Sequence, residues 1–280
     1  MLRLLHAEWL RKSLLRSIGK LHEMNSLQIP PQIRVHSLYW ANISRAILSG
    51  QRTVYRTLGI PLVQHLNDQK QHGIWMTEIL ADAGADDVIV FSDIDAFPLS
   101  SAAYRRAVDY ASRGGVFGLA QFSGHTETTD LYAGPMFLAL RKSIWENMGS
   151  PELSDSPSLD AGEIISIRAR ELGIPVMLVN PCCCINPKWA LAHAGVFGIG
   201  TFYGELEFFH LFQARADRSI ELFSKVADDV IEGRTLNFAA YLQLMNEEQL
   251  CERLSRRIHS VMKALSRQTR HYLYDQGRTD

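Results

Sequence analysis

The sequence has no long apolar run, almost no net charge and few cysteines. Its 280 residues include 29 lysines and arginines against 30 aspartates and glutamates, which leaves a net charge of −1. A chain without excess positive charge is not expected to bind nucleic acid by neutralising its phosphates. No run of about 18 uninterrupted apolar residues occurs, so we expect no transmembrane helix. At 46% hydrophobic residues, the chain can nevertheless bury a sizeable core.

Only four cysteines occur, and three of them, Cys182, Cys183 and Cys184, are consecutive. Neighbouring side chains on an extended strand point to opposite faces, so this run fits neither a disulfide framework nor a Cys-x-x-Cys zinc site. We interpret the three residues as small buried side chains in a reducing compartment. Charged residues interrupt the first 24 positions, so no secretory signal is expected there. The sequence therefore predicts a cytoplasmic protein.

Residues 1–24 are predicted to form an amphipathic helix within an N-terminal segment of residues 1–29. Apolar residues recur at roughly helical spacing, and basic residues outnumber acidic ones. One interpretation is a surface helix that contacts anionic lipid, which places the protein peripherally at a membrane. The other is a helix that packs on the domain or on a second subunit of a homo-oligomer. Pro30 and Pro31 end the helix because proline cannot continue it.

From residue 33 onward, apolar runs typical of strands alternate with helical patterns that end in glycine. Strands are expected at 33–39, 60–66, 87–91, 116–122, 136–140 and 174–179, and helices at 42–58, 72–83, 100–112, 142–148 and 160–172. This alternation predicts an α/β fold with a mostly parallel central sheet flanked by helices. We expect a single Rossmann-like domain over residues 30–215. Ligands of such sheets bind at the carboxyl ends of the strands.

Residues 216–280 are predicted to form a C-terminal extension that is helical and amphipathic. Apolar residues recur three to five positions apart from Phe238 to Leu265, and Gly233 interrupts the helical pattern. This extension either covers the sheet domain or serves as a dimerisation helix.

The strongest sign of chemistry is the pair Asp93 and Asp95, which follows the continuous apolar run 88–91. Such a run is typical of a strand buried on both faces of a parallel sheet. If the strand continues through the pair, its period of two places both carboxylates on one side. Two anionic oxygen ligands suit Mg²⁺ or Mn²⁺, which in turn binds the phosphates of a ligand. The alternative is a solvated strand end, where acidic residues are ordinary turn formers.

An apolar strand ending in Asp-x-Asp, in the middle of an α/β chain, resembles the metal-binding motif of nucleotide-sugar glycosyltransferases with the GT-A fold. Residues 132–137, Tyr-Ala-Gly-Pro-Met-Phe, resemble the segment that opens the acceptor half of such enzymes. Asp160-Ala-Gly-Glu163 opens a helix, as the catalytic carboxylate helix does in inverting members. His210 follows an aromatic-rich stretch, as does the late histidine that often ligates the metal. The resemblance covers roughly residues 33–215.

The resemblance implies transfer of a sugar from a nucleoside-diphosphate sugar to a hydroxyl group of a glycan or another acceptor. Asp93, Asp95 and His210 are then expected to hold Mn²⁺ or Mg²⁺ against the diphosphate. Asp160, or else Glu163, is expected to take the proton of the acceptor hydroxyl. A base on the face opposite the leaving group favours inversion at the anomeric carbon.

Further donor contacts are expected after the first two strands. Tyr39 and Trp40 follow the first strand, where a nucleobase stacks in this fold, and Asp68 follows the second, where it can meet base or ribose. The glycine-rich run 197–204 either closes over a donor or is an ordinary connection.

The carboxylates and the histidine also have interpretations that involve no catalysis. Asp160 is alternatively the N-cap of its helix, with Glu163 as the partner in a capping box. His210 is alternatively a hydrogen-bonded histidine of the core.

Two other functions compete with sugar transfer. Haloacid-dehalogenase-like phosphatases also place Asp-x-Asp after an apolar strand, and Asp93 is then the nucleophile. In that family the motif lies near the start of the domain, whereas about ninety residues precede it here. The third hypothesis is a non-catalytic module that binds sugar nucleotides through the same fold.

Overall fold

In the computed structural model, the described residues are 33–67, 69–123, 130–191 and 194–246. The chain divides into two compact units, Met1–Leu236 and Asn237–Asp280. The helix expected in residues 1–24, the predicted donor contact Asp68 and the residues beyond 246 lie outside the described parts. In the second unit, the described residues 238–246 are helical, as the apolar spacing predicts.

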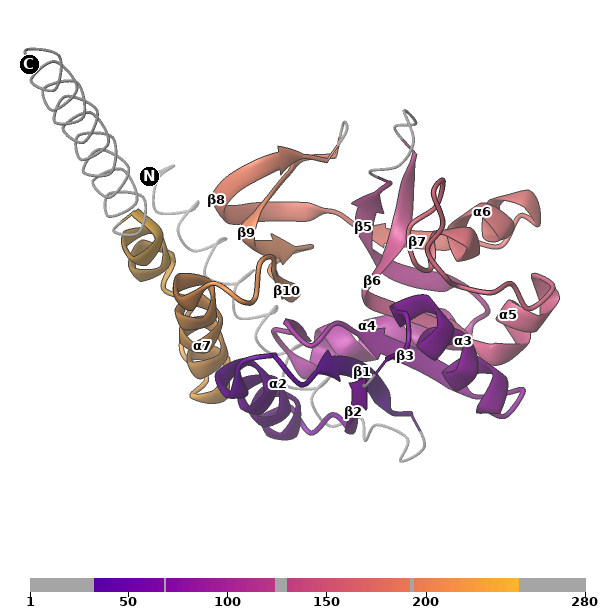
Figure 1. Cartoon of the computed structure of the whole chain (residues 1–280), viewed down its shortest axis with the longest axis horizontal. Coiled ribbons are helices and arrows are strands. Elements are labelled where there is room, and N and C mark those ends of the chain that lie inside the picture. The colour runs from indigo at the N-terminus through magenta and orange to yellow at the C-terminus, as the bar shows by residue number, and fades with distance from the viewer. Residues whose placement is uncertain (1–32, 68, 124–129, 192–193, 247–280) are drawn as a thin grey trace, which may run out of the picture. The chain divides into compact units, whose positions relative to one another are not determined.

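The first unit is built around a six-stranded sheet with the order β2-β1-β3-β6-β5-β7 (Figure 1). Its strands are β1 (Val35–Trp40), β2 (Leu62–Asn67), β3 (Val88–Ser92), β5 (Val116–Phe122), β6 (Leu131–Arg141) and β7 (Val176–Val179). All run parallel except β6, which is antiparallel to both of its neighbours. The predicted α/β fold with a mostly parallel sheet is therefore confirmed.

The strand β6 differs from the sequence prediction in length and direction. The prediction covered only residues 136–140, and the observed strand runs from Leu131 to Arg141. Its direction follows from the connection before it. Residues 123–130 are too few for a crossover between parallel strands, which needs a dozen or more residues. The chain therefore returns beside β5 in the opposite direction.

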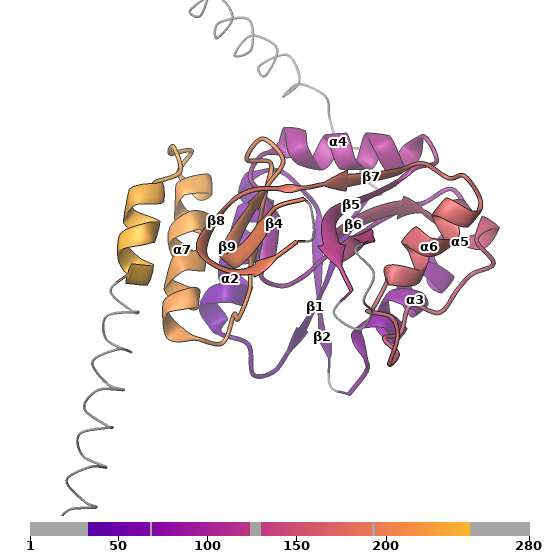
Figure 2. The same ribbon diagram turned by 90° about the horizontal axis from the view of Figure 1, so that it is seen from above.

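Helices cover both faces of this sheet. They are α2 (Arg45–Thr57), α3 (His72–Asp82), α4 (Ser101–Ser112), α5 (Lys142–Asn147) and α6 (Glu163–Glu171). Figure 2 shows α4 on one side of the sheet and α3, α5 and α6 on the other. The core on the second side includes Trp75 of α3, Phe91 of β3 and Ile165 of α6. At Gly73, a Cβ atom would lie 2.0 Å from the Leu153 carbonyl oxygen, so glycine lets α3 approach that backbone.

The two ends of α4 (Ser101–Ser112) have identifiable local causes. The Ser100 hydroxyl accepts a hydrogen bond from the Ala103 amide at 3.2 Å, which caps α4. Beyond its other end, Gly114 has a φ of +88°, the left-handed conformation that favours glycine. Local sequence was therefore sufficient to place this helix.

A second, four-stranded sheet has the order β4-β10-β9-β8 and is antiparallel throughout. Its strands are β4 (Ala96–Pro98), β8 (Pro181–Ala190), β9 (Val196–Tyr203) and β10 (Phe208–Leu211). The glycine-rich run 197–204 is neither the closing segment nor the plain connection expected from the sequence. Most of the run forms β9, a buried inner strand. A Cβ atom at Gly198 would lie 2.5 Å from the Ile185 carbonyl oxygen, so glycine allows close approach of β8.

Aromatic side chains pack on both faces of the second sheet. The rings of Phe137 on β6 and Phe208 on β10 lie 4.6 Å apart between the two sheets. On the opposite face, the rings of Phe97 and Phe209 lie 5.3 Å apart. The helix α7 (Asp217–Ile231) adds Phe223, whose ring lies 5.2 Å from Phe97. This helix also packs on α2. It therefore contributes to the core of the first unit.

The consecutive cysteines contradict their predicted burial. They lie on β8, the edge strand of the second sheet, where Cys182 and Cys183 are exposed and Cys184 is half-buried. An edge strand has a neighbouring strand on one side only, so its side chains are flanked by neighbours on that side alone.

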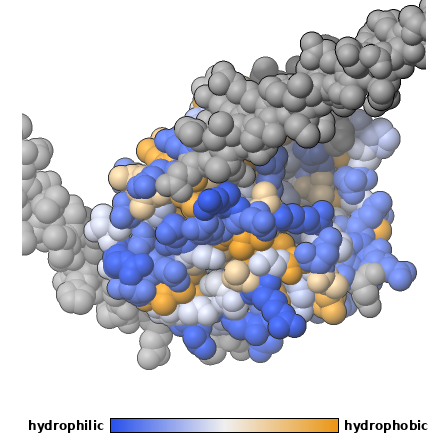
Figure 3. Space-filling view, turned by 60° about the vertical axis from the view of Figure 1, so that its left-hand side comes forward, coloured by the Kyte–Doolittle hydropathy of each residue, from blue (hydrophilic) through white to orange (hydrophobic). Residues whose placement is uncertain are grey.

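Within the described residues, no helix is both long and apolar enough to cross a bilayer. On the face of the molecule in Figure 3, hydrophilic residues predominate and hydrophobic ones form small patches.

Candidate metal centre

The two aspartates lie on the turn that joins the two sheets. The strand β3 ends at Ser92, and β4 begins at Ala96 in the other sheet. The Ala96 amide donates a hydrogen bond to the Asp93 carbonyl oxygen at 3.1 Å, which closes a turn of four residues. The strand does not continue through Asp93 and Asp95, so the condition under which its period would place both carboxylates on one side is not met. The turn nevertheless brings both carboxylates to one place at the carboxyl end of β3.

His210 reaches the aspartates from β10, which pairs with β4 so that His210 lies opposite Ala96. The Leu211 amide donates to the Asp95 carbonyl oxygen at 2.9 Å. The Nε2 atom of His210 lies 3.6 Å from Asp95 Oδ1 and 3.9 Å from Asp93 Oδ2. One ligand atom from each of the three residues falls within 4.8 Å of the others. The structure thus brings together three residues that the sequence analysis singled out.

This donor set suits a divalent cation. Carboxylate oxygens prefer hard ions such as Mg²⁺ and Mn²⁺, and an imidazole nitrogen is a common third ligand for transition metals. The His210 side chain is only 6% exposed, and its Nδ1 atom has no partner among the described residues. The Nε2 atom of this buried imidazole faces two carboxylates, so the three residues could hold a metal ion together.

Without a cation, the two adjacent carboxylates would repel each other and raise the free energy of the folded state. Burial raises the pKa of the Asp93 carboxyl above its ordinary value. The charge of Asp95 raises this pKa further, whereas His72 and His210 lower it. A divalent cation between the carboxylates would remove their repulsion and favour the ionised form of both.

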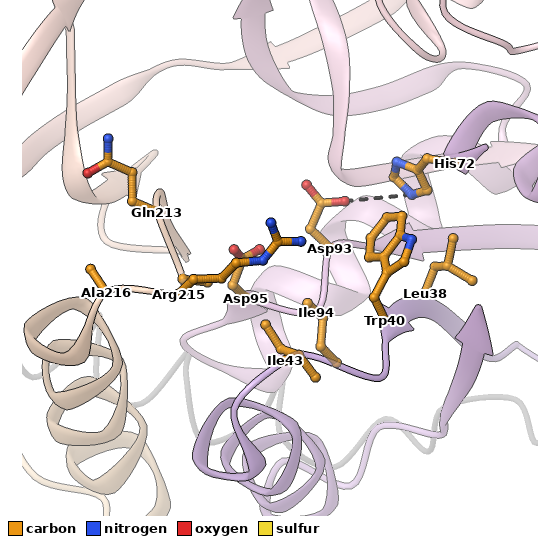
Figure 4. Close-up of a pocket in the computed structure, with 11 residues that line it drawn as sticks. Leu38, Trp40, Ile43, His72, Asp93, Ile94, Asp95, Gln213, Arg215 and Ala216 are labelled. Atoms are coloured by element: carbon orange, nitrogen blue, oxygen red, sulfur yellow. Dashed lines mark ion pairs between the residues drawn. The ribbon is translucent and has the colours of Figure 1, made fainter. Parts of the chain in front are cut away.

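The centre opens into a cavity of about 520 Å³ (Figure 4). Its walls come from the end of β1, the start of α3, the β3–β4 turn and the segment between β10 and α7. The lining residues are Leu38, Trp40, Ile43, His72, Asp93, Ile94, Asp95, Gln213, Ala214, Arg215 and Ala216. The cavity is therefore apolar on the β1 side and polar around the aspartates.

Trp40 provides a flat aromatic surface at the cavity. Its side chain is 41% exposed, and its ring contacts the edge of the His72 ring at 6.5 Å. His72 in turn lies 3.7 Å from Asp93 through its Nε2 atom and stacks on Trp75 at 5.6 Å. An exposed indole is suited to stack on a flat ring of a ligand.

Tyr39 lies beside Trp40 in the sequence but does not line this cavity. Successive side chains on a strand point to opposite faces, so the face that carries Leu38 and Trp40 excludes Tyr39. Asn67, the last residue of β2, has a structural role, because its Oδ1 atom accepts hydrogen bonds from the Gln69 and Lys70 amides at 3.0 and 2.7 Å.

Arg215 was not found by sequence reasoning, since a single arginine in a short connection carries no motif. It lies between β10 and α7 and directs its guanidinium toward Asp93 and Asp95 (Figure 4). Its neighbour Gln213 has a φ of +62°, a left-handed conformation that is strained for a residue with a side chain. A guanidinium beside a candidate metal centre is well suited to bind phosphate.

Asp160 and Glu163 lie at the start of α6 and are not among the residues that line the cavity. The helix begins at Glu163 with Gly162 in the N-cap position, so Asp160 as N-cap was wrong. Glu163 Oε2 accepts a hydrogen bond from the Asp160 amide at 2.9 Å, but Glu163 is the first helical residue and Asp160 is not the N-cap, so the capping box is also absent. The Tyr132 hydroxyl donates to Asp160 Oδ2 at 3.0 Å. Glu163 is buried, so Asp160 is the more accessible of the two carboxylates.

Gln51 of α2 supports the turn between β3 and β4 through hydrogen bonds, and it too was not identified from the sequence. Its Nε2 atom donates to the carbonyl oxygens of Asp93 and Ala96 at 2.7 and 3.0 Å. Its Oε1 atom accepts from Gln64 Nε2 at 2.9 Å. The sequence pattern could have identified this residue, because Gln51 is a polar residue on the buried, otherwise largely apolar face of α2. Buried amides need hydrogen-bond partners, and this one finds them on the turn that carries the aspartates.

No family model and no curated protein sequence matches this chain. Among solved structures, a similar chain is the mannosyltransferase PcManGT from Pyrobaculum calidifontis, in complex with GDP-Man and Mn²⁺. The two chains share 11% sequence identity, with a TM-score of 0.37. The match covers 59% of this chain and 61% of the mannosyltransferase chain, about three fifths of that protein's length.

Proposed function

We propose that this chain is a metal-dependent glycosyltransferase that moves a sugar from a nucleoside-diphosphate sugar to a hydroxyl group. The observation that carries the proposal is the meeting of Asp93, Asp95 and His210 at a cavity of about 520 Å³. Carboxylates that face such a cavity repel an anionic ligand by themselves, and a bound cation reverses this. The GT-A resemblance of the sequence motif supports the same function.

The cavity offers a separate group for each part of the donor. Trp40 provides a stacking surface for the nucleobase, and Arg215 provides a guanidinium for the diphosphate. Asp93, Asp95 and His210 would hold Mn²⁺ or Mg²⁺. When bound, that cation supplies Lewis-acid stabilisation of the charge that develops on the leaving phosphate.

For the transfer itself, we propose Asp160 as the base. The acceptor oxygen attacks the anomeric carbon, the bond from that carbon to the phosphate oxygen breaks, and the hydroxyl proton passes to Asp160. A base of this kind typically contributes about 10²–10⁴-fold. Tyr132 holds the Asp160 carboxylate through its hydrogen bond and so limits its orientation. Attack opposite the leaving group inverts the anomeric configuration. Glu163 holds the start of α6 in place, because its Oε2 atom accepts a hydrogen bond from the Asp160 amide.

The acceptor in this proposal is a glycan or another hydroxyl compound. We also propose that the protein is cytoplasmic and does not bind nucleic acid. The proposed segments are 1–29, 30–215 and 216–280. Residues 1–24 are proposed to contact lipid, and the protein to form a homo-oligomer.

The test is release of nucleoside diphosphate from a panel of nucleotide sugars with Mn²⁺, Mg²⁺ or a chelator. We expect metal-dependent release with one donor and its loss in Asp95→Asn, which removes a ligand charge at nearly constant volume. The matched control is Asp86→Asn, because the Asp86 side chain is 98% exposed and is not among the residues that line the cavity.

Unchanged turnover in Asp95→Asn would overturn the proposed metal centre. Metal-dependent donor binding without any release would instead favour the non-catalytic module. Transfer of a phosphoryl group to Asp93 would favour the phosphatase.

A further inference from the structure

The consecutive cysteines on β8 have an unusual geometry. Pro181 pairs with Tyr203 and Cys183 pairs with Phe202, so β8 holds one extra residue, Cys182, at this point. An extra residue of this kind is a β-bulge, which re-aims a side chain. On a regular strand, Cys182 and Cys183 would point to opposite faces. Here their Sγ atoms lie only 4.0 Å apart, and both residues are exposed.

Two adjacent thiols at this separation are poorly placed to form a disulfide. A disulfide bond is about 2.05 Å long and usually joins Cα atoms 4.4–6.8 Å apart, whereas adjacent Cα atoms are about 3.8 Å apart. The pair is instead well placed to share an ion. Two bonds of about 2.3 Å from sulfur to one metal ion span any sulfur–sulfur separation below about 4.6 Å.

We propose that Cys182 and Cys183 form a dithiol site for a soft, thiophilic metal or metalloid ion, separate from the centre at Asp93. Soft thiol ligands select ions such as Cu(I), whereas carboxylates select Mg²⁺ and Mn²⁺. The two sites of the chain therefore differ in the ions that they bind.

The probe is phenylarsine oxide added to the reduced full-length protein. Arsenic forms a bond to each of the two sulfurs, its bond to oxygen breaks, and the two thiol protons leave with that oxygen as water. No electron donor or acceptor is needed. The product is counted by intact-mass spectrometry after washing with excess monothiol, which strips arsenic from single cysteines but not from a chelating pair.

We expect one retained phenylarsenic group per chain. The double variant Cys184→Ser/Cys251→Ser should keep it, because Cys182 and Cys183 are then the only cysteines. Cys182→Ser and Cys183→Ser should each lose it. Asp95→Asn should keep it, so failure of the proposed glycosyltransferase function leaves this test intact.

Retention in either single variant at 182 or 183 would overturn the proposal, and so would loss in the double variant. Thermal unfolding of each variant checks that it is folded. Competition for Cu(I) with a coloured chelator provides a second readout. The proposal predicts that the double variant withdraws Cu(I) from the chelator and that each single variant does not.

Discussion

Arg215 is the residue whose charge most directly complements an anionic ligand of the cavity. Hydrogen bonds to charged groups contribute about 1.5–3 kcal/mol each. We therefore expect Arg215→Ala to weaken binding of a nucleoside diphosphate by roughly 10- to 100-fold. Arg215→Lys should recover part of this loss, because it keeps the charge but not the two parallel hydrogen bonds.

Isothermal titration with Mn²⁺ present measures the effect, and Arg218→Ala, on the exposed face of α7, is the control. Equal affinities of the wild type and Arg215→Ala would show that the guanidinium does not contact the ligand.

His36 and His65 form a half-buried pair of histidines on β1 and β2. His36 Nδ1 lies 3.1 Å from His65 Nε2, and the two rings stack. Burial lowers the pKa of His36 from 6.5 to about 4, and the charges of His65 and Arg34 act in the same direction. Burial also lowers the pKa of His65.

These shifts predict how stability depends on pH. Above pH 6.5 both histidines are neutral in the folded and unfolded chains, and their contribution is fully present. As pH falls from 6.5 toward 4, the unfolded chain binds protons first, so the folded state loses stability. Each unit of pKa difference corresponds to about 1.4 kcal/mol.

We expect the urea unfolding free energy to fall between pH 7 and pH 5, and to fall less in His36→Gln. An identical decrease in the variant would contradict the role of this pair.

At the scale of elements, α2 positions the turn between β3 and β4. Gln51→Leu removes both donors to the carbonyl oxygens of Asp93 and Ala96 while keeping similar volume. Loss of a group that orients metal ligands typically costs about 10–100-fold in affinity, and we expect that range for Mn²⁺. The unfolding free energy should fall by about 1–3 kcal/mol, because buried carbonyl groups lose partners.

The control is Arg52→Ala, which removes only the exposed outer hydrogen bond to Gln64. Titration of Mn²⁺ followed by its electron paramagnetic resonance signal gives the affinity. Equal Mn²⁺ affinity in Gln51→Leu and Arg52→Ala would rule out a positioning role for Gln51.

At the scale of the whole molecule, the candidate metal centre joins the two sheets. Asp93 follows β3 of the six-stranded sheet, and His210 belongs to β10 of the four-stranded one. A cation held by both resists their separation, so binding should stabilise the whole first unit. A ligand at about a hundred times its dissociation constant adds roughly 2.7 kcal/mol.

We expect Mn²⁺ with the correct nucleoside diphosphate to raise the melting temperature, and His210→Ala to abolish most of the rise. A chelator should remove the effect in the wild type. A full rise in His210→Ala would mean that the two sheets are not joined through this residue.

The sequence alone was sufficient for features that depend on near neighbours. The buried run of β3 and the glycine after α4 were predicted because periodicity and helix-ending signals act within a few residues. Asp93 and Asp95 were found for the same reason, since they directly follow a recognisable strand. The α/β class followed from the alternation of these local patterns.

Only the tertiary structure decided what depends on residues far apart in the chain. It showed that β6 runs antiparallel, that a glycine-rich run is the inner strand β9, and that a bulge turns two neighbouring cysteines to one side. It also brought His210, Arg215 and Gln51 to the two aspartates. Local periodicity records which side of an element is buried, but not which distant element buries it. Strand pairing and loop closure make that choice, and they brought His210 beside Asp95.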